Sequence, residues 1–103
     1  MSLIRILGFL AALAGAAAAA EGATEHVCVS APQGSYEGET IACYSDAGCM
    51  IAEKMDGEPV RGFDEASAPF ALARGKIAAI VTSSHQLMRT VAKAGARCTP
   101  AGP

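Results

Sequence analysis

The four cysteines are the residues in this chain with the most specific chemistry. Cys43 and Cys49 lie close together around an Asp-Ala-Gly turn signal, whereas Cys28 and Cys98 lie far apart in the sequence. Neighbouring thiolates can bind zinc or exchange disulfides, but zinc ligands and redox pairs usually lie closer in sequence than Cys43 and Cys49 do. The spacing therefore favours structural disulfides over a reactive or metal-binding pair.

Other side chains could also bind a metal ion. His26 lies two residues before Cys28 and could form a zinc pair with it. Copper(I) prefers soft sulfur, which Met50, Met55 and Met88 could supply together with His85. Methionine is, however, an ordinary gap-filling residue of protein cores. We predict no metal site and no cofactor, and we keep an envelope zinc, copper or thiol-redox accessory protein as the alternative function.

A nucleophile and a base occur side by side in Ser83-Ser84-His85. Adjacent residues rarely face one another as a nucleophile and its base, and neither serine has the flanking glycines of a nucleophile elbow. Ser83 and Gln86 instead have the spacing of a helix capping box. We therefore predict that this segment begins a helix, that the chain has no catalytic residues and that it is not an enzyme.

Residues 1–20 have the pattern of a secretory signal peptide. Arg5 precedes an apolar run over residues 6–13, and the alanines at 16–20 provide small residues before Glu21. We predict cleavage after Ala20, which leaves residues 21–103 as a single small exported domain, periplasmic or secreted, with no stable membrane insertion after cleavage. The alternative is an N-terminal membrane anchor that is retained.

Export and an even number of cysteines together predict two disulfides. We favour Cys28–Cys98, which would join the ends of the mature chain, and Cys43–Cys49, which would close a small loop. The pairing of Cys28 with Cys43 and of Cys49 with Cys98 joins neighbouring segments and remains open. A domain of this size has a small core, so the disulfides are expected to matter for its stability.

The charge of the chain argues against a polyanionic partner. Its formal net charge is −2, and one of its eight basic residues, Arg5, falls in the predicted signal peptide. The other basic residues are scattered singly, whereas nucleic-acid binding needs a basic patch. We predict that the protein binds no nucleic acid and that its partner is an unidentified protein in the envelope or outside the cell.

Short strands and one clear helix follow from the residue patterns. Strands are predicted at residues 25–30, 40–44, 76–82 and 96–99. The capping box and the apolar repeat after it predict a helix over 84–94, and Pro69 and Gly75 delimit a shorter one over 69–74. Between them, residues 46–55 form either a short helix capped by Asp46, which we favour, or one arm of a hairpin around Asp56-Gly57.

These elements predict a small α+β fold: a disulfide-stapled domain with short strands and one well-formed C-terminal helix. The alternative is a mostly α-helical hairpin, because residues 76–82 could also continue the preceding helix and pack against residues 84–94.

We therefore predict a non-catalytic binding or inhibitor-like protein that acts through a loop made rigid by the disulfides. Tyrosine is favoured at binding surfaces, and the glycine-flanked Tyr36 and the turn after residue 43 are the best candidates. We predict Tyr36, Tyr44 and Asp46 as binding residues.

Overall fold

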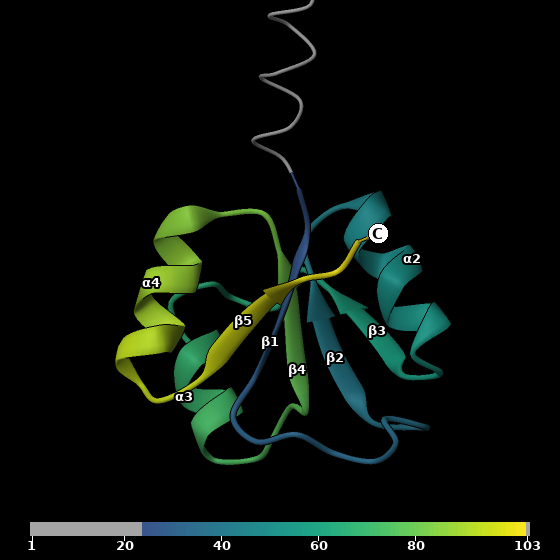
Figure 1. Cartoon of the computed structure of the whole chain (residues 1–103), viewed down its shortest axis with the longest axis horizontal. Coiled ribbons are helices and arrows are strands. Elements are labelled where there is room, and N and C mark those ends of the chain that lie inside the picture. Colours follow the sequence, from purple (N-terminus) through teal and green to yellow (C-terminus); the bar gives the residue numbers. More distant parts are fainter. Residues whose placement is uncertain (1–23, 103) are drawn as a thin grey trace, which may run out of the picture.

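The computed structural model describes residues 24–102, and the predicted signal peptide lies outside them. Figure 1 shows one central sheet with helices on both of its sides. The strands are β1 (His26–Val29), β2 (Thr40–Cys43), β3 (Glu58–Arg61), β4 (Ala79–Thr82) and β5 (Arg97–Pro100). The helices are α2 (Asp46–Lys54), α3 (Ala68–Ala73) and α4 (His85–Lys93).

The sheet has the strand order β3-β2-β4-β1-β5. β2 is parallel to β3 and to β4, whereas β1 is antiparallel to both β4 and β5. Helix α2 connects β2 to β3 on one side, and α4 connects β4 to β5 on the other. From β2 the chain continues to β3 at one edge of the sheet, and from β4 it continues to β5 at the other edge. The order of the strands therefore reverses between β2 and β4.

Two apolar layers cover the two faces of the sheet. Ile41, Cys43 and Val81 point towards α2, and Ala42 and Ile80 point towards α3 and α4. The alternation predicted for residues 41–44 is present, but Ile41, Ala42 and Cys43 are all buried because β2 lies inside the sheet. Helix α2 packs on β2, β3 and β4, while α3 packs on β4 and α4 packs on β5 and α3.

Both disulfides link segments that the sheet already brings together. Cys28 lies directly opposite Cys98 on the neighbouring strands β1 and β5, and the two are bonded. Cys43, the last residue of β2, is bonded to Cys49 in α2. This is the pairing favoured from the sequence. One disulfide links the edge strand β5 to β1, and the other links α2 to β2.

Helix caps differ in detail from the sequence predictions. α2 is capped by Ser45, whose hydroxyl accepts a hydrogen bond from the Gly48 amide, and not by Asp46. α4 is capped by Ser84, whose hydroxyl accepts from the Leu87 amide, so the predicted Ser83–Gln86 box is wrong by one residue. Ser45 and Ser84 both have the extended backbone that a cap requires.

The predicted α+β class and the two disulfides are confirmed, but a single C-terminal helix is wrong. α2 and α3 form as well, and Ala79–Thr82 is a fully buried strand, which excludes the helical hairpin. The hairpin around Asp56-Gly57 is also wrong, because β3 runs parallel to β2. Asp56 instead takes a left-handed conformation, with φ of 64°, and ends α2.

Among residues 24–102 no helix has the length and apolar character needed to cross a membrane. The two disulfides are compatible with a location outside the cytoplasm.

Candidate functional site

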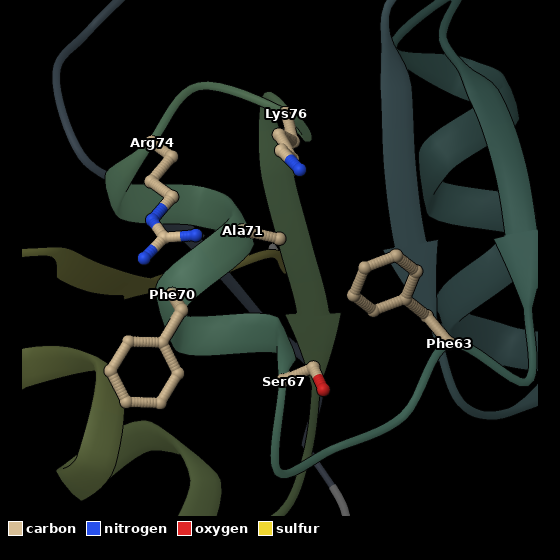
Figure 2. A pocket seen from close by; sticks show the side chains of 6 residues that line it. All are labelled: Phe63, Ser67, Phe70, Ala71, Arg74 and Lys76. Carbon is tan, nitrogen blue, oxygen red and sulfur yellow. The ribbon is translucent and has the colours of Figure 1, made fainter.

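A cavity of about 470 Å³ lies beside α3, on the side of the sheet that α3 and α4 cover only in part. Its walls are mostly apolar and include two aromatic rings and two basic side chains. We call it the α3 cavity; its lining residues are Phe63, Ser67, Phe70, Ala71, Arg74 and Lys76. In Figure 2 the Phe63 ring and the Ala71 side chain face one another across β4, and Phe70 and Arg74 lie on the outer side of α3.

Phe63 reaches this position through a tight turn after β3. Gly62 has a φ of 86°, a conformation that favours glycine, and it turns the chain from β3 towards α3. Asp64, which follows Phe63, is also fixed, because its carboxylate accepts hydrogen bonds from both the amide and the hydroxyl of Ser67. Phe63 is thereby held between two ordered turns and packs, half-buried, against the core.

The other wall is α3 itself. Ala68, Ala71 and Leu72 bury the inner side of the helix, which leaves Phe70 on the outside with 65% of its surface exposed. Pro69 fits the first turn, where a helix needs no amide donor. The helix ends before Gly75, whose φ is 77°, so that Arg74 and Lys76 flank the turn at one end of the cavity.

Tyr44, a predicted binding residue, packs against the same core cluster as Phe63 but does not line the cavity. Its hydroxyl oxygen is buried and has no hydrogen-bond partner among residues 24–102. Burial, with smaller contributions from the negative charges of Glu65 and Asp64, raises the pKa of the Tyr44 phenol to about 12. Tyr44 is therefore a neutral, half-buried residue directly after β2.

We expect Tyr44→Phe to leave the protein folded and to change how its stability depends on pH. Because the pKa of the Tyr44 phenol is higher in the folded chain than its usual value of 10, the wild type should lose stability as the pH rises from about 10 to 12. Over that pH window the variant should lose less stability than the wild type. At neutral pH it should be as stable as the wild type, since the substitution removes an unpaired polar group. Urea unfolding at pH values below and within the window measures the difference; equal losses would contradict the assignment.

The other two predicted binding residues lie away from the α3 cavity. Asp46 is in the first turn of α2 and forms an exposed ion pair with Arg61 at the end of β3. Tyr36 precedes β2 and packs on the opposite face of the sheet, where it lines a groove of about 790 Å³ with Val27 and Val29. The three residues thus do not form one site.

A polar cluster lies at the strand ends between β2 and β4, where the strand order reverses. Open parallel sheets commonly bind ligands at this place. Here, however, the chain fills part of it: the Ser45 hydroxyl donates to one carboxylate oxygen of Glu25 over 3.0 Å. The other Glu25 oxygen is buried and has no hydrogen-bond partner among residues 24–102, and a Cβ on Gly48 would lie 3.0 Å from it. Glu25 therefore ties the start of β1 to the N-terminus of α2.

We expect Ser45→Ala to destabilise the fold by about 1–2 kcal/mol, because it removes a helix cap and the hydrogen bond to Glu25 together. Ser84→Ala is the matched control: it removes a cap of the same kind from α4, without a carboxylate partner, and should cost about 1 kcal/mol. Urea unfolding of both variants gives the comparison. A smaller loss for Ser45→Ala than for Ser84→Ala would contradict the role given to Glu25.

The remaining chemical candidates are not brought together. Within residues 24–102 no three His, Cys, Asp or Glu side chains are grouped to hold a metal ion, and all four cysteines are in disulfides. Ser84 caps α4 and His85 is exposed at its first residue; no hydrogen bond among the described residues joins His85 to Ser83 or Ser84. Of the residues considered for copper, Met50 lies in α2, whereas His85 and Met88 lie in α4 on the other side of the sheet.

Sequence reasoning missed the α3 cavity. Phe63, Phe70, Arg74 and Lys76 are spread over 14 positions and match no motif. One signal could have pointed to them: the mature chain predicted from the sequence contains only two phenylalanines, and Phe70 falls on the outer side of a helix whose Pro69 and Gly75 limits were predicted correctly.

No family model matches this sequence, and no sequence of a curated protein matches it either. Two solved structures resemble the fold. Protein AF1704 from Archaeoglobus fulgidus superposes with a TM-score of 0.58 at 22% identity, over 78% of this chain and 31% of that protein. ArtJ from Geobacillus stearothermophilus, an arginine-, lysine-, histidine-binding protein, gives 0.53 at 19% identity, over 75% of this chain and 38% of ArtJ. The chain therefore spans less than two fifths of either protein, and the likeness concerns the fold.

Proposed function

We propose that this protein is a non-catalytic binding protein that acts outside the cytoplasm and takes a small organic molecule into the α3 cavity. The observation that carries the proposal is the placement of two aromatic rings, one half-buried and one 65% exposed, around a concave apolar surface. Fully burying a phenylalanine side chain is worth about 1.5–3 kcal/mol, so a ligand that covers Phe70 gains part of that energy.

Size and character of the cavity support a small ligand. Sites for small molecules have volumes of roughly 300–1,000 Å³ and are lined mainly by apolar and aromatic side chains with a few polar groups. The α3 cavity, with about 470 Å³, falls in that range. Its two sides belong to segments fixed by the Asp64–Ser67 hydrogen bonds and by the packing of α3, so it exists without rearrangement.

The fold is compatible with this proposal. ArtJ, which shares the fold, binds arginine, lysine and histidine, and this chain spans 38% of it, so the likeness supports a binding function without carrying over the ligand. The expected protein partner and the inhibitor-like mode have no comparable observation in their favour. The turn after residue 43 that was expected to act as a loop forms the cap and first turn of α2 instead.

An NMR titration of the mature protein with phenylnaphthylamine, a neutral aromatic probe, tests the proposal. We expect saturable amide shifts concentrated at residues 63–76. Phe70→Ala should weaken binding several-fold, while Met50→Ala, which removes the other large exposed apolar side chain, should leave it unchanged. Shifts confined to the groove at Val27 and Val29, or no saturable shifts at all, would contradict the proposal.

The metal or redox alternative is tested separately by intact-mass spectrometry. The proposal predicts a mature chain that is four hydrogens lighter than its reduced form and carries no metal, because both cysteine pairs are oxidised. A reduced chain with stoichiometric metal, isolated from its native compartment, would favour the alternative.

A further inference from the structure

We propose that the ligand of the α3 cavity is an organic anion, with one carboxylate, sulfonate or phosphate attached to an apolar body. The inference rests on the proposed binding function and adds the chemical class of the ligand. It follows from the two cations at the cavity, Arg74 and Lys76, and from the apolar walls beside them.

No other residue of the described part of the chain neutralises either cation. Among residues 24–102 the one ion pair is that of Arg61 with Asp46, on the other side of the sheet from α3, and neither Arg74 nor Lys76 makes a side-chain hydrogen bond there. The lining contains no carboxylate. Asp64, the acidic residue next to Phe63, already accepts two hydrogen bonds from Ser67. The positive charge at the cavity is therefore available to a ligand.

The backbone places the two basic residues on either side of one turn. Arg74 ends α3, Gly75 turns with a φ of 77°, and the Lys76 amide donates back to the Ala71 carbonyl over 2.8 Å. In Figure 2 both residues lie at the end of α3 away from Ser67, with the Arg74 side chain on the outer side of the helix and the Lys76 side chain near the start of β4. A helix C-terminus favours one nearby cation, but that preference does not explain a second cation at the same cavity.

The ligand should therefore lie with its anionic group at the Arg74–Lys76 end and its apolar part along Phe63, Ala71 and Phe70. A free anion in solution fits better than an anionic membrane surface. The two cations lie in a cavity between two walls and not on a basic stretch, and the chain as a whole carries a net charge of −2, which anionic lipid surfaces repel.

A pair of probes that differ in charge tests the class of ligand. Anilinonaphthalene sulfonate has the same aromatic body as phenylnaphthylamine and carries one sulfonate. We expect it to bind more tightly than the neutral probe. The double substitution Arg74→Gln and Lys76→Gln should weaken binding of the sulfonate roughly fivefold, since each exposed ion pair contributes about 0.5 kcal/mol, and should change binding of the neutral probe less than twofold. Raising the salt concentration should reduce the difference between the probes.

The control is the double substitution Arg89→Gln and Lys93→Gln, which removes two exposed cations of α4 that do not line the α3 cavity. It should leave both affinities within twofold of wild type. Equal binding of both probes, with no effect of Arg74 and Lys76, would overturn the anion proposal and leave the cavity as a binding site. Absence of binding by either probe would overturn the proposed function itself. Sedimentation of the protein with phosphatidylglycerol vesicles, lost on removing Arg74 and Lys76, would also overturn the proposal, in favour of a membrane surface.

Discussion

Replacing Cys28 and Cys98 with alanine should lower the free energy of unfolding by about 4 kcal/mol. The two residues are separated by 70 positions, so their disulfide restricts almost the whole mature chain in the unfolded state. In the folded state it joins β5 to β1 at the edge of the sheet, where β5 pairs with no other strand in the described part of the chain. Small domains have a net stability of only about 5–15 kcal/mol, so this loss is a large fraction of the total.

The matched control is the same substitution at Cys43 and Cys49. Their sequence separation is only 6, and the chain-entropy contribution of so short a loop is about 2 kcal/mol. Cys28 and Cys43 are both fully buried, which makes the lost packing similar in the two variants. Urea unfolding followed by circular dichroism measures both. An equal loss, or a larger loss for the Cys43–Cys49 variant, would contradict the role given to the long-range disulfide.

Gly57→Ala should be the most damaging of the glycine-to-alanine substitutions, with a loss of about 1–3 kcal/mol. A Cβ at this position would lie 2.3 Å from Cδ1 and 2.9 Å from Cγ1 of Ile41, and 3.1 Å from the Glu39 carbonyl oxygen. Ile41 is fully buried under α2 and cannot move away without opening the core, and the Glu39 carbonyl is engaged by the Glu58 amide. The close approach of residue 57 to β2 therefore requires glycine.

Gly34→Ala serves as the control, because no atom lies within 4 Å of its added Cβ and its backbone is not in the left-handed region. It should leave stability unchanged or slightly higher. Thermal unfolding of the two variants gives the comparison. A wild-type melting temperature for Gly57→Ala would show that β2 and the end of α2 can separate, in contradiction to the packing described above.

Local signals in the sequence predicted most of the strands and the limits of α3 and α4. Residues with strong backbone preferences carried this information: Pro69 and Gly75 delimit α3, and Gly95, with a φ of 97°, ends α4. The exact caps were less predictable, because Ser45 and Asp46, or Ser83 and Ser84, are adjacent residues with similar capping ability. Which one caps depends on where the preceding strand ends.

The order of the strands and the α3 cavity could not be predicted in the same way. Pairing of β1 with both β4 and β5 joins residues far apart in sequence, and short strands of three or four apolar residues do not specify their neighbours. The Asp56-Gly57 pair resembles a hairpin turn, yet here packing of Gly57 on Ile41 and the left-handed Asp56 end a helix instead. The cavity arises only once Phe63 and α3 are placed on the same side of the sheet.

The most direct test of the account uses the two phenylalanines of the predicted mature chain, Phe63 and Phe70, both of which line the α3 cavity. Ring-labelled phenylalanine should therefore give two sets of ring signals. With saturating phenylnaphthylamine, we predict nuclear Overhauser effects from the probe to both rings. A saturated complex in which neither ring contacts the probe would contradict the central claim that the α3 cavity is the binding site.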